Sequence, residues 1–427
     1  MNDQKLIPAG SGEKMQYVAH LFNDHTMRFV LRFPGQLDPE ILRNAMLALV
    51  SSVDILHASF IPNAFGAKWH IHDDICAEDC FAACRCEGDP LSAADPYLKQ
   101  PIPHTARAQM RCTLLQGGDS CAVVLAISHL CVDGGDGKYL LRKLAEAYSL
   151  IERTGSADAL RIKNGDRSAE QVYAHLSRKE VRSQMKQPGT PKTLFPFAEP
   201  DDSARRPHIL HSAVSAEIMS KARQRAKAAN ATANDVILTA GYRAYADLPG
   251  AQKDAAMAIS SMMDVRKYCP GGDSAGLSNV SGLFPTQLER GVSGSFEDTL
   301  AQISAQTRAI KQDPLGGLVG LPLLHAAIRT LPMALLLKGA PAVYKIMSIS
   351  MTNLGNLRFE DHAFGDLVPN DGLLICPIKK MPSVQAGVMS FGGHCRFSCA
   401  IECSDSEAAQ IQVWLDGIAS QIIEYAK

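Results

Sequence analysis

The sequence carries almost no net charge, with 43 Lys and Arg residues against 44 Asp and Glu residues. Such a balance gives no overall field that would draw the protein to nucleic acid or to an anionic membrane. We therefore expect no nucleic-acid partner, and we expect any partner to be recognised by a local site.

Signals for export, membrane insertion and metal binding are also missing. Residues 1–12 lack the basic, apolar and small-residue order of a secretory signal, which favours a cytoplasmic protein. Residues 315–337 are nearly apolar, but His325 and Arg329 interrupt them. We expect a buried or tunnel-lining helical pair there and no integral membrane segment. The cysteines between residues 76 and 86 lack the Cys-x-x-Cys pairs of zinc sites, so no metal is expected.

What the sequence does contain is a mixture of strand and helix patterns that predicts an α/β fold in two halves. A polar, proline-containing stretch predicts the boundary, with a first half at residues 1–185, a linker at 186–207 and a second half at 208–427. Strands are predicted at 28–33, 106–115, 122–128, 209–214, 257–263, 280–287, 346–353, 373–377, 386–391 and 396–402. Helices are predicted at 39–50, 138–153, 216–229, 234–245 and 407–425.

The motif that carries chemistry is His-x-x-x-Asp-Gly, from His129 to Gly134. It follows an apolar strand and precedes a glycine-rich helix start, so the strand fixes the imidazole while the loop leaves it accessible. With an unperturbed pKa of about 6.5, the imidazole is largely neutral at neutral pH and able to accept a proton. The pattern favours His129 as a general base. A hydrogen-bonded core histidine is the alternative.

This segment resembles the active-site signature of the superfamily that contains chloramphenicol acetyltransferase, peptide-synthetase condensation domains and the polyketide-associated and plant alcohol acyltransferases. Ser128 stands where many members have a further histidine. Other segments resemble the superfamily in the same order along the chain, at residues 233–240, 263–266, 279–284 and 352–355. The chain lacks an Asp-Phe-Gly-Trp-Gly motif, so it resembles the plant branch less closely.

The resemblance implies a V-shaped pseudo-dimer of two chloramphenicol-acetyltransferase-like halves with His129 at the middle of a tunnel. It implies that Asp133, grouped with His129 at the catalytic motif, pairs with Arg266 and holds the loop. The oxyanion would be bound by backbone amides near Gly134 or by side chains of the second half. Ser128, Thr352 and Asn353 are the candidates for binding the oxyanion or positioning the substrate.

The implied function is acyl transfer to a hydroxyl or amine acceptor from a thioester of coenzyme A or of a carrier protein. The thioester is then a co-substrate, and no bound cofactor is expected. The partners are a small-molecule donor and acceptor and, for the second donor type, an acyl or peptidyl carrier protein. A stand-alone condensation enzyme of peptide-synthetase type and a catalytically silent binding module of the same fold remain alternatives.

Overall fold

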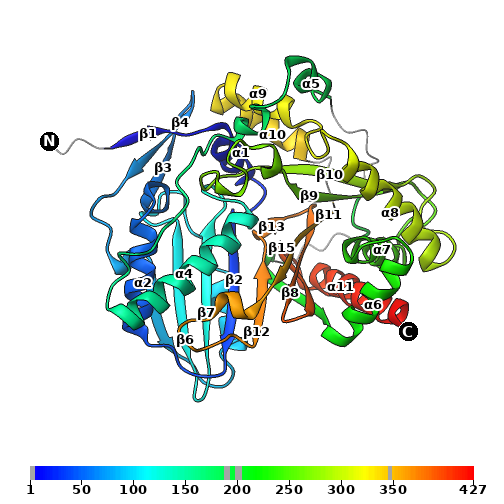
Figure 1. The fold of residues 1–427 in the computed structure, drawn as a ribbon. Helices are drawn as coiled ribbons and strands as arrows, with labels where there is room; N and C mark the ends of the chain where they lie inside the picture. Colours follow the sequence, from blue (N-terminus) through cyan, green and yellow to red (C-terminus); the bar gives the residue numbers. More distant parts are fainter. Residues whose placement is uncertain (1–4, 187–192, 198–203, 345–348) are drawn as a thin grey trace.

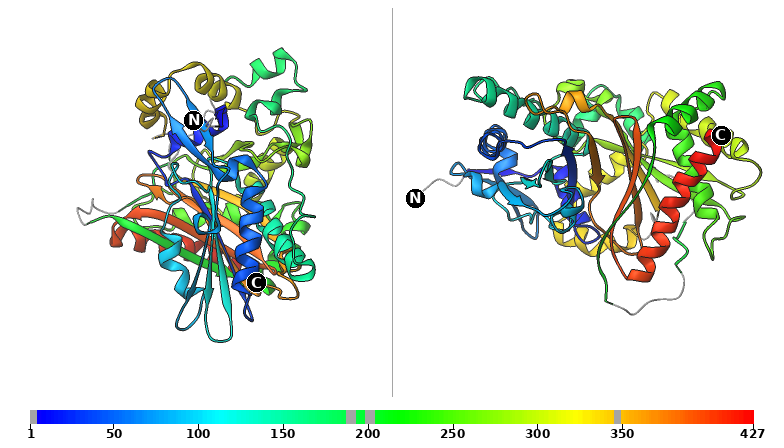
Figure 2. Two further views of the ribbon diagram at one scale, coloured as in Figure 1. Left: turned by 90° about the vertical axis from the view of Figure 1, so that its left-hand side faces the viewer. Right: turned by 90° about the horizontal axis from the view of Figure 1, so that it is seen from below.

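Two α/β lobes build the molecule, and each packs helices against its own β-sheet (Figure 1). The computed structural model describes residues 5–186, 193–197, 204–344 and 349–427. Helices α2 and α4 of the first lobe lie at one end of the molecule, and helices α6, α7 and α11 of the second lobe lie at the other (Figure 2). The predicted α/β class and its two halves are confirmed.

The first lobe is centred on a five-stranded sheet in the order β12–β2–β7–β6–β5. Asp38 caps α2, because its side chain accepts hydrogen bonds from the amides of Glu40 and Ile41. The strands predicted at 106–115 and 122–128 are β6 and β7, which pair antiparallel. A smaller sheet has the order β1–β4–β3. The elements are β1 (Leu6–Pro8), α1 (Ser11–Ala19), β2 (Thr26–Phe33), α2 (Pro39–Ser51), β3 (Ala58–Pro62), β4 (Ala67–Ile71), β5 (Phe81–Arg85), α3 (Asp95–Leu98), β6 (Met110–Gln116), β7 (Cys121–Ser128) and α4 (Gly134–Thr154).

The second lobe has a seven-stranded sheet in the order β10–β9–β11–β14–β15–β13, with β8 also paired to β15. Cys395, Cys399 and Cys403 all lie on the buried face of β15 that packs in the core of this lobe, as their spacing predicts. The elements are β8 (Arg206–Val214), α6 (Ala216–Ala228), α7 (Ala233–Ala246), β9 (Met257–Asp264), β10 (Ser281–Leu288), α8 (Phe296–Gln312), β11 (Ile349–Leu357), β13 (Lys379–Lys380), β14 (Val384–Phe391), β15 (His394–Cys403) and α11 (Asp405–Ala426).

One strand crosses from the second half of the chain into the sheet of the first lobe. Strand β12 (Asp371–Ile375) pairs antiparallel with β2, from Asp371 opposite Arg32 to Ile375 opposite Arg28. Just beyond it, the amide of Lys380 donates to the carbonyl of Phe22 at 2.8 Å. The division of the chain at 186–207 stays a prediction, but the two lobes share this crossing segment.

The apolar stretch at 315–337 differs in part from the expectation. It forms the predicted helical pair, α9 (Leu321–Thr330) and α10 (Met333–Tyr344), beside α1. The prediction that the pair is buried was only partly right, because the pair lies on the outside of the molecule. It leaves several leucines exposed, namely Leu323, Leu324, Leu331 and Leu335. Among the described residues, no helix is long and apolar enough to cross a membrane. Between residues 169 and 185 the chain forms a 3-10 turn and the short helix α5 (Arg178–Ser183).

The crossing of β12 depends on a glycine. A Cβ atom at Gly372 would lie 2.5 Å from two ring carbons of Phe391 and 3.0 Å from the carbonyl oxygen of Val30, so ring or strand must move. We expect Gly372→Ala to lower the free energy of unfolding by about 1–3 kcal/mol, as overpacking of a core does.

Chemical denaturation measures this loss. Gly118→Ala is the matched control, because nothing lies within 4 Å of a Cβ atom at Gly118. Equal stability of the two variants would contradict the close packing at β12.

Candidate active site

His129 lies in the short link between the end of β7 at Ser128 and the start of α4 at Gly134. Its backbone amide donates to the carbonyl of His25 at 2.7 Å. Its side-chain Nδ1 lies 2.9 Å from Oδ1 of Asn279, which comes from the second lobe. The position of His129 is therefore fixed by both lobes, and the residue as a whole is half-buried.

The amide of Asn279 decides which nitrogen of His129 carries the proton. Its Nδ2 donates to the carbonyl oxygens of His129 at 2.9 Å and Leu130 at 3.4 Å. Carbonyl oxygens only accept, so the NH₂ group must face them and Oδ1 must face the imidazole. Nδ1 of His129 is then the donor, and the lone pair is left on Nε2. The contact leaves a neutral His129 with Nε2 as its basic atom.

The surroundings keep His129 neutral. Burial lowers its pKa below the usual value, and the nearby charge of Lys379 lowers it further, while Asp133 acts in the opposite direction. His25, which is buried beside it, has its pKa lowered to about 4, chiefly by burial. At neutral pH the site therefore presents uncharged imidazoles.

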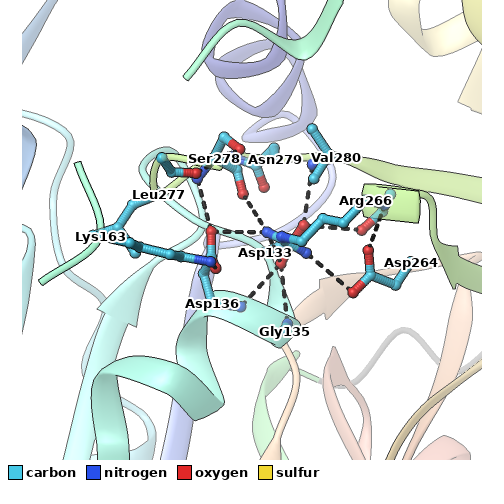
Figure 3. Close-up of polar contacts among 12 residues, drawn as sticks. Asp133, Gly135, Asp136, Lys163, Asp264, Arg266, Leu277, Ser278, Asn279 and Val280 are labelled. Carbon is cyan, nitrogen blue, oxygen red and sulfur yellow. Dashed lines mark hydrogen bonds and ion pairs between the residues drawn. The ribbon is translucent and has the colours of Figure 1, made fainter. Parts of the chain in front are cut away.

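Asp133 is fully engaged in holding the loop. It caps α4, with Oδ1 accepting from the amides of Gly135 at 3.0 Å and Asp136 at 3.2 Å. Its Oδ2 accepts from the amide of Val280 at 3.0 Å, and Arg266 donates to Oδ1 at 3.0 Å (Figure 3). The pairing of Asp133 with Arg266 is the one that the resemblance implies. With these partners, Asp133 orients the loop and does not contact the His129 ring nitrogens.

Arg266 joins three carboxylates from the two lobes (Figure 3). Besides Asp133 it pairs with Asp136 at 2.8 Å and Asp264 at 3.3 Å. Burial acts to lower the pKa of Arg266, but the charges of Asp133 and Asp136 outweigh it and raise the pKa. Lys163 also pairs with Asp136. The pKa of Asp136 is nevertheless raised, by burial and then by Asp133.

Gly134 lies close to the second lobe. A Cβ atom there would lie 2.5 Å from Cδ2 of Leu354 in β11, and Lys138 donates to the Leu354 carbonyl. The start of α4 therefore contacts β11 directly.

The other predicted residues lie apart from the imidazole. Ser128 is completely buried, and its hydroxyl has no partner among the described residues. Asn353 donates to Oδ1 of Asn234 at 3.0 Å and accepts from the amide of Gly355 at 2.8 Å. Thr352 pairs along β11 with Gly387 of β14. In the part of the chain that the structure describes, no hydrogen bond joins Thr352 or Asn353 to His129.

Sequence reasoning missed several residues of this site. It noted Asn279 only as part of a strand-like segment, and it did not single out Asp136, Lys163 or Ser278. The backbone amide of Ser278 donates to Oδ2 of Asp136 at 2.8 Å across 142 residues of sequence. The only local signal was an acidic residue in the first turn of α4.

Two other chemistries find no support in the geometry. Residues 272–274, inside the Gly-x-Ser-x-Gly sequence, form a 3-10 turn and no strand-to-helix elbow. Over the described ranges, no group of three or more His, Cys, Asp and Glu side chains is placed to hold a metal ion.

The two-lobed fold and a loop histidine held between the lobes define a chloramphenicol-acetyltransferase-like protein. Within that class, a family model described as Condensation domain matches residues 13–313, and the chain belongs to this family. Condensation domains generally transfer acyl or peptidyl groups and work with carrier proteins and small substrates. A comparison with curated proteins finds no match.

Solved structures agree on the fold. The epimerization domain from the third module of tyrocidine synthetase B has a TM-score of 0.70 and 17% identity, over 99% of this chain and 97% of that one. The first condensation domain of the calcium-dependent antibiotic synthetase, with a substrate analogue, gives 0.70 and 16%, over 99% and 98%. Polyketide synthase associated protein 5 from Mycobacterium tuberculosis gives 0.68 and 16%, over 99% and 100%.

Removing the arginine should destabilise the protein strongly. Arg266→Met leaves Asp133 and Asp136 buried side by side without their shared cation, and breaking a buried pair in this way costs about 3–5 kcal/mol. The repulsion raises the pKa of Asp136 further in the folded variant, so folding takes up protons. Stability of the variant should therefore recover as the pH falls from 7 toward 5.

Denaturation of native and variant chains at several pH values tests this. Arg358→Met is a suitable control, since Arg358 forms an exposed pair with Asp361. If Arg266→Met loses the same free energy of unfolding at every pH from 7 to 5, the buried carboxylates are not the cause of the lost stability.

Proposed function

We propose that this protein is an acyltransferase in which Nε2 of His129 is the general base. The donor is a thioester of coenzyme A or of a carrier protein, and the acceptor is a hydroxyl or an amine. The observation that carries the proposal is the contact of Asn279 with Nδ1 of His129, which leaves the lone pair on Nε2. No bound metal or organic cofactor takes part.

The reaction follows from this tautomer. Nε2 takes the proton of the acceptor as its oxygen or nitrogen attacks the thioester carbonyl carbon. The tetrahedral intermediate collapses, the carbon–sulfur bond breaks, and the leaving thiolate takes the proton back from His129. The products are an ester or amide and a free thiol. Throughout the reaction, Oδ1 of Asn279 accepts a hydrogen bond from Nδ1–H of His129, and this bond keeps the ring from turning.

The negative oxygen of the intermediate needs a hydrogen-bond donor. Asp133 already occupies the amides of Gly135 and Asp136 at the start of α4. The amide of Gly134 is the donor we favour, because it lies at the positive end of the helix dipole. Thr352 and Asn353 remain alternatives that would act through the substrate, and Ser128 would act by packing beneath His129.

Family membership gives weight to a second candidate, a stand-alone condensation enzyme with a carrier-bound donor and an amine acceptor. It uses the same base and differs in needing a carrier protein as partner. A catalytically silent binding module would not need one fixed tautomer of His129, so the hydrogen bond from His129 to Asn279 favours an enzyme.

Thiol release tests the proposal with two kinds of donor, a panel of acyl-coenzyme A thioesters and an acyl carrier protein loaded with the same acyl groups. We expect His129→Ala to lower kcat about 10²- to 10⁴-fold, the usual contribution of a general base. Asn279→Leu should lower kcat at least about tenfold, because the imidazole proton could then lie on either ring nitrogen. Asn356→Leu, at an exposed asparagine of β11, should leave it unchanged.

The donor that supports turnover separates the two candidates. Full activity of His129→Ala would refute the base assignment. A native chain without turnover on either donor would point to the silent module.

The pH dependence offers an independent check. Because burial lowers the pKa of His129, the base stays unprotonated until the pH falls below 6.5. The acid limb of kcat/KM should therefore lie below pH 6.5. Lys379→Met removes a positive charge that lowers this pKa, so it should move the limb to higher pH. An acid limb above pH 7 in the native chain would contradict the buried neutral base.

A further inference from the structure

Helices α9 and α10, on the outside of the molecule, are apolar even on the side that faces water (Figure 1). The inner side of α9 is buried through Leu321, His325 and Ile328. A surface helix normally combines such an inner stripe with a polar outer face. The outer face here carries leucines instead, namely Leu323 and Leu324 of α9, Leu331 between the helices and Leu335 of α10. Each of the four is at least 38% exposed, so the described chain leaves them open to water.

The turn between β3 and β4 extends this apolar surface. The amide of Ala334, in the first turn of α10, donates to the carbonyl of Ala64 at 3.2 Å and holds the turn beside the helix. The next residue, Phe65, is 84% exposed, the highest value among the large apolar side chains that the structure describes. We call the four leucines and Phe65 the α9–α10 face. Apolar side chains gathered at a surface in this way mark a site of interaction.

The charges around the α9–α10 face are positive. The sequence has no Asp or Glu between residues 314 and 359, nor in residues 58–72 around the β3–β4 turn. Arg329 and Lys338 are exposed on the helical pair. Their side chains form no hydrogen bond or ion pair with another described residue. Both cations are therefore available to a negatively charged partner.

A second group of cations lies beside them at α5 (Figure 1). The amide of Gly320, directly before α9, donates to the carbonyl of Gln184 at 2.9 Å, so the chain at the end of α5 lies against the start of α9. Residues 178–186 contain one acid, Glu180, whose carboxylate accepts hydrogen bonds from Ser177. Their four cations are all exposed, namely Arg178, Lys179, Arg182 and Lys186. Because the whole chain has a net charge of -1, this positive surface is local.

The combination of side chains favours a lipid partner over a protein. Leucine and phenylalanine on one face, with Lys and Arg around it, are typical of helices that lie in a membrane interface. Leucine is uncommon among the residues that dominate protein–protein binding, where Trp, Tyr and Arg prevail. Cations near a membrane surface are attracted to the phosphates of anionic lipids. Since no described helix could cross a membrane, the contact would be peripheral.

We propose that the α9–α10 face binds the surface of a membrane that contains anionic lipids. The leucines and Phe65 enter the boundary between the headgroups and the acyl chains. Arg329, Lys338 and the cations of α5 contact the lipid phosphates. This inference goes beyond the proposed function and does not depend on His129.

Flotation of the full chain with lipid vesicles tests the proposal. The native chain should bind vesicles made of equal parts of phosphatidylcholine and phosphatidylglycerol. Added salt should weaken this binding, because it screens the cations. Vesicles of phosphatidylcholine alone should bind the chain at least about tenfold more weakly. No binding to the mixed vesicles, or equal binding to both kinds, would overturn the proposal.

A double substitution of leucines locates the apolar part of the contact. Leu331→Gln with Leu335→Gln should weaken binding to the mixed vesicles at least about tenfold, because two apolar side chains no longer enter the bilayer. Val413→Gln with Ile423→Gln, at exposed apolar residues of α11, is the matched control and should bind as the native chain does. Thermal unfolding first checks that both variants are folded. Equal binding by the two double variants would contradict the proposal.

A second pair of substitutions tests the cations. Arg329→Gln with Lys338→Gln should weaken binding about 25-fold, at about fivefold for each cation near the membrane surface. Lys227→Gln with Lys311→Gln, at exposed lysines of α6 and α8, removes the same charge elsewhere and should have a much smaller effect. If both pairs weaken binding equally, only the total charge matters and the assignment to the α9–α10 face is wrong.

The Phe65→Trp variant measures insertion directly. The two native tryptophans, Trp69 and Trp414, are fully buried, so only the new indole is placed to respond to lipid. Its fluorescence emission should move to shorter wavelength when mixed vesicles are added. Val413→Trp, on the exposed side of α11, should show no such shift. An unchanged emission of Phe65→Trp under conditions where the protein floats with vesicles would place the contact elsewhere and overturn the proposal.

The His129→Ala variant separates this inference from the proposed function. It should bind the mixed vesicles as tightly as the native chain. Vesicle binding by a native chain that transfers no acyl group would support the membrane contact and refute only the proposed function. A chain that binds no vesicles, but forms dimers or binds a carrier protein through the same leucines, would assign the α9–α10 face to a protein partner and overturn the proposal.

Discussion

The buried ion pairs of Arg266 are the interaction on which the site depends. Asp133 and Asp136 stand at the start of α4 in the first lobe, whereas Asp264 ends β9 in the second lobe and Arg266 follows that strand. Two carboxylates this close repel each other in a medium of low dielectric, and a shared guanidinium makes the arrangement stable. The position of the motif loop is therefore set jointly by the lobes. Neither lobe alone contains the partners that hold it.

The two polar residues near His129, Asp133 and Asn279, have roles that differ from those of the residues in a Ser-His-Asp triad. In such a triad a carboxylate bonds the ring and stabilises its charged form. Here the carboxylate of Asp133 is occupied by backbone amides and Arg266, and a neutral amide, Asn279, bonds the ring. A neutral partner fixes the tautomer, and its hydrogen bond raises the pKa of His129 by less than burial lowers it. With burial, this keeps the imidazole of His129 neutral at neutral pH.

Local patterns predicted much of the fold because the deciding interactions were local. The helix predicted at 39–50 and the neighbouring strands predicted at 106–115 and 122–128 are examples. Helix α8 was missed although Ser295 caps it in a capping box with Asp298, since its exposed face is strongly polar. The crossing of β12 has no local signal, because its partner β2 lies more than 300 residues earlier. The motif and the superfamily resemblance together pointed to His129, Asp133 and Arg266. The role of Asn279 depends on contacts across about 150 residues and needs the structure.

The crossing of β12 also bears on how the chain folds as it is made. When β7 leaves the ribosome, the first lobe has four strands of its sheet, and β2 still presents an unpaired edge. At roughly 5–20 residues per second, the closing strand follows only after about 10–50 s. An exposed, apolar strand edge is a template for pairing with other chains. Synthesis in a cell therefore leaves an interval in which chaperones that shield strand edges would protect this protein from aggregation.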